Sequence, residues 1–291
     1  MVPAVAAWAE EGGMGHYTPG ANASFIDMLP GRTGIAVTDA FVYRPVSAGR
    51  VPVAGAVVDN LDGNVFADSL LALYRTPVEL LGGNLGFGAA LAVAWVDVSG
   101  TGARSGSDSG IADVLLYPFL LGWTRGDLQY DVRLGIYAPT GKYEVGSLAN
   151  LGKNYWTFEP GLAVSWLSAK TGLEASGFVA VDVNTRNDAT DYQSGSQFHL
   201  DATLAKHFAL PGGRLGAGAS AFYYQQIGSD SGSGATLGAF KASSIGVGPA
   251  ASYATKVDWL DLAVELKWLP EIHSDNRVEG DLFWIKVRAV F

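Results

Sequence analysis

The chain has 291 residues, no cysteine, a formal net charge of −9 and only 16% charged residues, whereas soluble domains usually have about 25%. The lack of cysteine excludes disulfides and thiolate metal sites, and the acidic balance argues against a nucleic-acid partner, which requires a basic surface. The hydrophobic fraction is 48%, yet no window approaches the roughly 18 consecutive apolar residues of a transmembrane helix. Apolar residues spread thinly along a chain are typical of a transmembrane β-barrel, in which only alternate residues face lipid.

The first residues have features of the end of a signal peptide. Ala7-Trp8-Ala9 fits the small-x-small cleavage pattern, and the polar stretch 10–13 follows it. Neither a basic region nor a full apolar region precedes this site. Residues 1–9 are therefore interpreted as a signal-peptide remnant or, alternatively, as a disordered tail.

Residues 10–33 precede the first alternating stretch and include two proline–glycine-rich positions, Pro19-Gly20 and Pro30-Gly31. Proline has no N–H to donate and glycine weakens strand pairing, so a membrane strand is not expected here. A barrel of about twelve strands has interior space that its own side chains do not fill. We therefore expect this segment to enter the barrel and narrow the pore; the alternative is a periplasmic tail outside it. The expected constriction residues are His16, Tyr17, Phe25 and Asp27.

Beyond this segment, apolar and polar residues alternate with a period of two. Between Leu128 and Ile136, for example, every second residue is apolar or aromatic, and Asp131 and Arg133 lie on the opposite face. Stretches of this kind predict strands at 34–44, 63–75, 84–98, 111–123, 127–138, 155–167, 172–185, 194–208, 214–226, 242–254, 258–270 and 278–291. Every backbone polar group in lipid must be paired, so the sheet must close on itself. Residues 34–291 are therefore predicted to form an all-β, transmembrane antiparallel β-barrel of about twelve strands.

Short and long connections alternate between these strands. Tight turns are expected at 124–126, 168–171, 210–213 and 255–257, and long polar loops at 99–110, 140–154, 186–193 and 227–241. Bacterial outer-membrane barrels have short periplasmic turns and long external loops. The alternation thus predicts a protein of the bacterial outer membrane with both termini in the periplasm.

The last strand ends on an aromatic residue, Phe291, with apolar residues at alternate positions before it. This ending resembles the assembly signal of bacterial outer-membrane proteins. It implies outer-membrane lipid and the barrel assembly machinery as partners, and an ordinary C-terminal strand is the alternative.

Strand parity predicts which side chains point into the lumen. The residues assigned to the lumen are Asp113, Tyr117, Phe119, Asp131, Arg133, Glu159, Glu174, Asp182, His199, Asp201, Asp261, Glu265, Lys267, Lys286 and Arg288. The basic pair Lys286 and Arg288 is expected within reach of the acidic residues on the preceding strand. Tyr117 and Phe119 predict a partly apolar wall for weakly polar or aromatic solutes, or else a packing surface for the N-terminal residues.

The four histidines offer little support for an enzyme. A barrel hydrolase would need a Ser–His pair oriented by a third polar group. His199 and His207 have inward parity, and His273 falls in an expected external loop. No acidic residue is grouped with a histidine at ligand spacing, so neither a metal nor a cofactor is predicted. The Ser/Gly/Asp-rich stretch 105–110 lacks a suitably placed bidentate glutamate for Ca²⁺ and is interpreted as a flexible external loop.

Four stretches are suggestive in combination: His16–Gly20, Asp27–Gly31, Ala138–Tyr143 and Asn150–Pro160. They resemble segments of the outer-membrane channel family named after the meta-pathway of phenol degradation, and the likeness extends from about residue 15 to the C-terminus. The resemblance implies a monomeric barrel that moves small molecules, hydrophobic or aromatic ones among them, and it supplies no catalytic residues. A passive channel is the favoured function; the alternatives are an outer-membrane enzyme of lipase or protease type and a non-conducting structural barrel.

Overall fold

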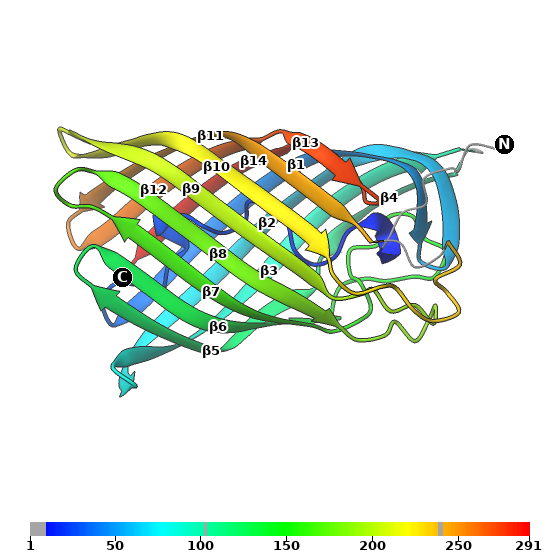
Figure 1. The fold of residues 1–291 in the computed structure, drawn as a ribbon, viewed down its shortest axis with the longest axis horizontal. Helices are drawn as coiled ribbons and strands as arrows, with labels where there is room; N and C mark the ends of the chain where they lie inside the picture. The colour runs from blue at the N-terminus through cyan, green and yellow to red at the C-terminus, as the bar shows by residue number, and fades with distance from the viewer. Residues whose placement is uncertain (1–9, 102–103, 238–240) are drawn as a thin grey trace.

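The computed structural model describes residues 10–101, 104–237 and 241–291, so the expected leader remnant at 1–9 lies outside the described residues. The described strands form one tilted antiparallel sheet that closes on itself (Figure 1). Its strands are β1 (Gly34–Val53), β2 (Ala56–Leu80), β3 (Gly83–Gly100), β4 (Arg104–Ile111), β5 (Val114–Arg125), β6 (Leu128–Ala138), β7 (Thr157–Leu167), β8 (Leu173–Asn184), β9 (Gln197–Leu210), β10 (Gly213–Gln226), β11 (Ser243–Val257), β12 (Leu260–Leu269), β13 (Glu271–Asp275) and β14 (Leu282–Val290).

The strands β1 to β14 occupy twelve positions around the barrel, because two of these positions each contain two strand segments. β4 and β5 both pair with β3, and β12 and β13 both pair with β11. Each position pairs with its neighbours in sequence, and pairing of β1 with β14 closes the ring. The predicted all-β barrel of about twelve antiparallel strands is confirmed. Among the described residues, no helix has the length and apolar character needed to cross a bilayer.

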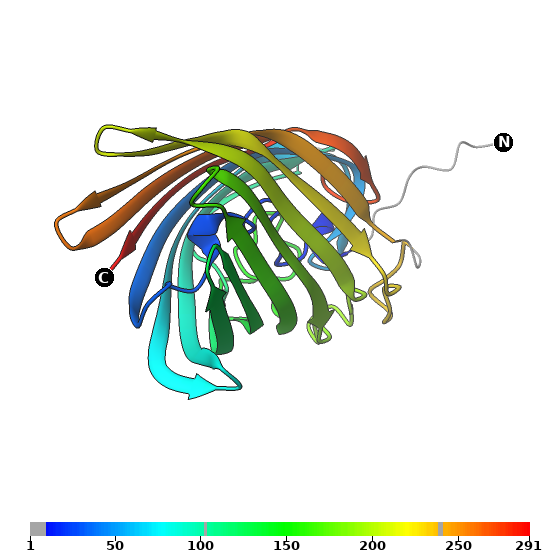
Figure 2. The same ribbon diagram turned by 60° about the vertical axis from the view of Figure 1, so that its left-hand side comes forward.

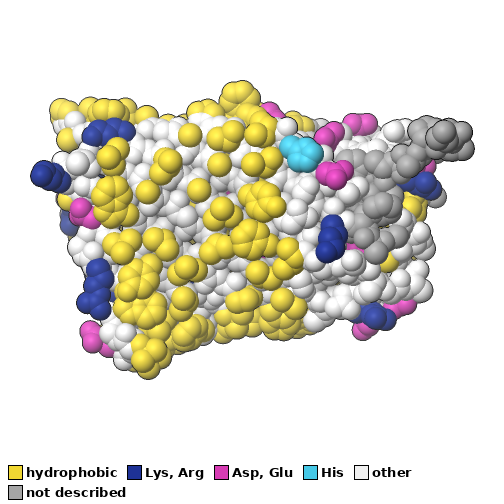
Figure 3. All heavy atoms as spheres, in the orientation of Figure 1, with side chains coloured by type: hydrophobic (Ala, Val, Ile, Leu, Met, Phe, Trp, Pro, Cys, Tyr) yellow, Lys and Arg dark blue, Asp and Glu magenta, His cyan; other side chains and the backbone are white. Residues whose placement is uncertain are grey.

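The outward face is mostly apolar where it would contact lipid, with Asp39 on β1 and Asp68 on β2 as exposed acidic residues among the apolar ones. On β9, Leu200, Leu204 and Phe208 are exposed, whereas the intervening His199 and Thr203 are buried. On the face drawn in Figure 3, apolar side chains form a broad band across the wall, and charged side chains gather toward the two ends. This distribution is what a closed sheet in a bilayer requires, since lipid solvates apolar side chains and excludes charge.

A charge placed in this band should destabilise the barrel. Leu204 is 67% exposed on the outward face, so Leu204→Arg is expected to lower the free energy of unfolding in lipid vesicles by about 2–4 kcal/mol. Urea titration of the vesicle-embedded protein measures this. Lys206→Arg, at the half-buried next outward position of β9, is the matched control and should change little. An unaltered unfolding midpoint for Leu204→Arg would contradict the placement of this face against lipid.

Strand boundaries at one end of the barrel differ from the prediction. Residues 104–110, expected to be part of a loop, belong to β4, which pairs with β3 from Gly100 opposite Arg104 to Val93 opposite Ile111. The flexible external loop expected at 105–110 is therefore wrong, and His273 lies in β13 rather than in a loop. Water can reach both faces of a strand that extends beyond the bilayer, so such a strand does not need the apolar alternation that marks a membrane strand.

The β1–β2 hairpin also extends further than expected and turns only at Ala54-Gly55, where both φ values are positive (46° and 83°). Its tip carries three buried valines, Val51, Val53 and Val58, which pack with Val278. In Figure 1 this hairpin curls over the end of the barrel that carries the long loops. It therefore covers part of the opening at the long-loop end.

Residues 10–33, called the N-terminal segment below, pass through the inside of the barrel. At the long-loop end, the Glu10 amide donates to Asp230 at 2.9 Å; at the tight-turn end, Arg75 donates to the carbonyl of Pro30 at 2.9 Å. Figure 2 brings the tight-turn end forward and shows the dark-blue segment within the ring of strands. The last residue of the chain also lies at the tight-turn end. The two described ends of the chain therefore lie at opposite ends of the barrel, unlike the expectation of both termini in the periplasm.

Candidate functional site: the barrel interior

The first half of the N-terminal segment is held by polar side chains of the inner wall. The His16 ring lies between Thr157 Oγ1, at 2.7 Å from Nδ1, and Asp113 Oδ2, at 2.9 Å from Nε2. The Tyr17 hydroxyl donates to Asp201 at 2.5 Å. Asp201 also accepts the backbone N–H groups of residues 20 and 22, at 3.0 and 3.2 Å. The buried Asp201 carboxylate thus holds the segment at residues 17, 20 and 22.

The second half of the segment is held by cations of the last strand. The Lys286 amine contacts Asp27 at 2.9 Å and donates to the carbonyl of Ala21 at 2.6 Å. Arg288 donates to the carbonyls of Ile26 and Met28, at 2.7 Å for the latter. These bonds involve backbone groups that no strand pairing satisfies, because η2 (Phe25–Asp27) is only a single 3₁₀ turn.

Two more contacts involve the residues expected to form the constriction or the charged pair. The Phe25 amide donates to the Glu174 carboxylate at 2.9 Å. Lys286 lies 3.4 Å from Glu265. Arg288 has no such contact with Asp261, which is half exposed at the tight-turn end and lies 3.5 Å from Arg32 and 3.7 Å from Lys256.

Most residues assigned to the lumen are buried. Those that are at most 9% exposed are Asp113, Tyr117, Asp131, Arg133, Glu159, Glu174, Asp182, His199, Asp201, Glu265, Lys267, Lys286 and Arg288. The structure brings some of them together: Arg133 pairs with Asp131 at 2.7 Å, and Lys267 pairs with Glu265 at 3.1 Å.

The inward position expected for Phe119 is wrong. Phe119 is 37% exposed on the outer wall, and Leu120 is fully buried instead. The pairing of β5 with β6 shifts register between Leu116 and Phe119, around Pro118. Proline cannot donate to the ladder, so a bulge forms there and the parity changes by one residue.

A cavity of about 350 Å³ lies between the N-terminal segment and the wall formed by β1–β3. The wall residues that line it are mostly small and apolar: Ala40, Val42, Val65, Ala67, Ala90, Ala92, Ala94 and Val96. His16 and Tyr17 line it from the segment. The sequence analysis missed this wall, although alternate alanines on β3, at positions 90, 92 and 94, were a signal for it.

A second cavity, of about 510 Å³, lies at the tight-turn end. It is lined by Phe25, Ile26 and Leu29 of the N-terminal segment and by Arg288, among others. The two cavities share no lining residue. The N-terminal segment therefore borders both cavities, which are not continuous with each other.

The comparisons with known proteins agree with this architecture. Residues 48–287 match the family model described as MetA-pathway of phenol degradation. The chain belongs to this family. No curated protein matches it. The match covers most of the barrel, from the tip of the β1–β2 hairpin to the last strand, and begins after the N-terminal segment.

Two solved structures show the same fold. The COG4313 outer membrane channel from Pseudomonas putida F1 is 18% identical, with a TM-score of 0.65 over 94% of this chain and 100% of that chain. The β domain of the Bordetella autotransporter BrkA is 13% identical, with a TM-score of 0.52 over 89% of this chain and 100% of that chain. Both likenesses show that this family member has the β-barrel fold of outer-membrane proteins.

The long-loop end of this family member contains a buried acid, Glu10. Neither carboxylate oxygen has a hydrogen-bond partner among the described residues, and Asp230 lies nearby. Burial raises the pKa of Glu10 to about 7, against the opposing effect of the Arg277 charge. The Glu10 carboxyl is therefore largely protonated below neutral pH, and this neutral form is buried where the N-terminal segment begins.

Proposed function

We propose that this chain is a passive channel of the bacterial outer membrane for small hydrophobic or aromatic molecules. The N-terminal segment is its constriction, and the solute moves between this segment and β1–β3. The observation that carries the proposal is the cavity of about 350 Å³ between the two. An aromatic ring can lie against the small apolar side chains of this wall, and an ion in contact with them would lose hydration. The charged residues Arg44, Asp113 and Lys153 line other parts of the cavity.

The membrane placement rests on the apolar outer face and on the family. In this proposal the tight-turn end faces the periplasm and the long-loop end faces outside, since bacterial barrels have short turns on the periplasmic side. The chain works as a monomer, is surrounded by outer-membrane lipid and is inserted by the barrel assembly machinery through Phe291, which directly follows β14.

The interior supports a channel over an enzyme. Thr157, His16 and Asp113 are connected like a nucleophile, a base and an acid. However, Thr157 donates its proton to Asn184 Oδ1 at 2.6 Å, and the Asn184 amide nitrogen faces two backbone carbonyls. Thr157 Oγ1 therefore presents a lone pair, and not its proton, to His16. A nucleophile needs the opposite arrangement, in which the base accepts its proton.

Blocking the apolar wall should reduce flux. Ala92 lines the cavity from β3, so Ala92→Phe is expected to lower the uptake of phenol into liposomes several-fold, because the ring fills the space that a solute would use. Ala89→Phe is the matched control, since Ala89 is exposed on the outer face of the same strand. Equal uptake by the wild-type protein and both variants would refute the proposed path.

A further inference from the structure

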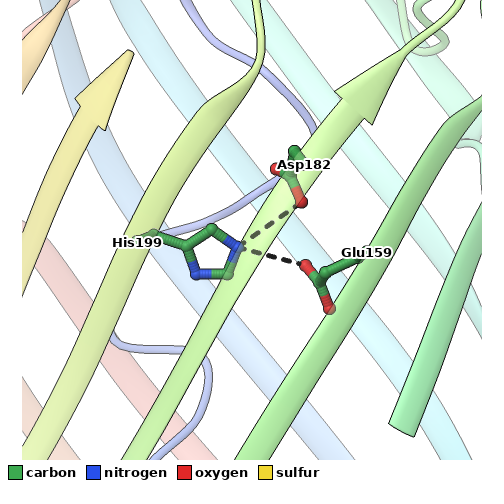
Figure 4. Close-up of side chains that lie close together, drawn as sticks. All are labelled: Glu159, Asp182 and His199. Atoms are coloured by element: carbon green, nitrogen blue, oxygen red, sulfur yellow. Dashed lines mark ion pairs between the residues drawn. The ribbon is translucent and has the colours of Figure 1, made fainter. Parts of the chain in front are cut away.

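Three titratable side chains come together on the inner face of the wall formed by β7, β8 and β9 (Figure 4). His199 Nε2 lies 3.4 Å from Glu159 Oε2 and 3.4 Å from Asp182 Oδ1. Each of the three side chains is at most 1% exposed. They come from three neighbouring strands, and in the β8–β9 ladder His199 lies opposite residue 180, next to the inward position of Asp182.

Apart from these two 3.4 Å contacts, the polar atoms of this cluster lack protein partners among the described residues. Both Asp182 oxygens, Glu159 Oε1 and both His199 nitrogens are buried and form no hydrogen bond with residues 10–101, 104–237 or 241–291. Gln197 lies directly opposite Asp182 in the ladder, and its amide oxygen and nitrogen are also unpartnered. Buried polar atoms in native proteins nearly always have a partner, and a group of unpartnered ones that face one another indicates a bound species.

We propose that Glu159, Asp182 and His199 bind one divalent transition-metal ion of the Zn²⁺ class. Ligands about 2.0–2.2 Å from a tetrahedral ion lie about 3.3–3.6 Å from one another. The two separations of 3.4 Å fit this geometry, and all three candidate ligand atoms lie within 4.8 Å of one another. One imidazole and two carboxylates suit Zn²⁺ better than Ca²⁺ or Mg²⁺, which prefer oxygen ligands alone. The two carboxylates also balance the charge of the ion.

The site would connect the wall to the N-terminal segment. The Tyr17 ring stacks on His199, with 3.8 Å between ring centroids and 17° between their planes. A metal bond to Nε2 would fix the orientation of the imidazole on which Tyr17 packs, as bonds to a ligating histidine do in known metal sites. Bound metal should therefore make the docked segment more resistant to protease. The ligands are 23 and 17 positions apart in sequence, which is why their spacing did not predict a metal site.

The test uses ZnCl₂ as the probe and the full chain, refolded in detergent with the metal present. After exhaustive dialysis, plasma mass spectrometry should find about one Zn²⁺ per folded chain. His199→Gln and Asp182→Asn should each weaken binding by roughly tenfold or more, and His273→Gln, an exposed histidine in β13, should retain it. Heat-modifiable migration in gels verifies that each variant is folded.

Two further measurements keep the inference falsifiable if one variant fails to fold. Glu159→Gln removes a different ligand and should also lose the ion. Co²⁺ in place of Zn²⁺ should give the intense visible bands of a four-coordinate site in the wild-type protein, and these bands should be absent from the folded ligand variants. A folded wild-type protein that retains no Zn²⁺, or ligand variants that retain as much as the wild type, would overturn the assignment and leave the cluster as a buried ion-pair group.

Discussion

Replacing Lys286 with methionine should release the second half of the N-terminal segment and raise the single-channel conductance several-fold. The Lys286 amine is 1% exposed and lies 2.9 Å from Asp27 of the segment and 3.4 Å from Glu265 of the wall. Methionine fills a similar volume but leaves both carboxylates without this cation. Removing one partner of a buried ion pair typically costs about 3–5 kcal/mol, and undocking Asp27 into water avoids part of this cost.

Single-channel recording in planar bilayers measures the effect. Lys256→Met is the matched control. Lys256 is exposed at the tight-turn end of the barrel, and its amine lies as far as 3.7 Å from the Asp261 carboxylate. The control should conduct like the wild type. A Lys286→Met barrel that is folded and has wild-type conductance would show that this cation does not hold the constriction in place.

Replacing Asp201 with alanine should have a comparably large effect on the first half of the segment. Its carboxylate accepts the Tyr17 hydroxyl at 2.5 Å and two backbone N–H groups of the segment, and it is 1% exposed. Each buried donor left without an acceptor costs about 1–3 kcal/mol. The docked segment should therefore open, and proteinase K should cleave it several-fold faster than in the wild-type protein.

Asp127→Ala, in the exposed turn after β5, is the control for Asp201→Ala and should leave the cleavage rate unchanged. The cleaved bonds, identified by mass spectrometry, should lie within residues 10–33. Cleavage confined to the external loops, at a rate equal to that of the wild type, would contradict the role given to Asp201.

The barrel could be predicted from sequence because lipid imposes a simple rule on every membrane strand. Leu200 and Leu204 alternate with His199 and Thr203, and no soluble surface would require this pattern over twelve strands. Apolar and polar residues need not alternate in a strand that has water on both faces, so β4 and β13 were missed. It was also misleading at Phe119, because parity assumes an unbroken ladder and Pro118 interrupts it.

The interior could be predicted only in part. Strand parity assigns a side chain to the inside but does not say which side chains meet there, because the register between strands decides that. The cluster of Glu159, Asp182 and His199 therefore appears only in the folded sheet. The path of the N-terminal segment was expected from its prolines and glycines and from the interior space of a barrel of this size, whereas its entry from the long-loop end follows from contacts such as Glu10 with Asp230.

Deleting residues 15–32 and recording single-channel currents tests the central claim most directly. The barrel should still fold, because β1 begins at Gly34 and pairs with both β2 and β14 without help from the segment. With the segment gone, the two separate cavities should join into one path, and a folded, heat-modifiable deletion variant should conduct several-fold more than the wild type. A folded variant with unchanged conductance would contradict the account, since the segment could not then be the constriction of this barrel.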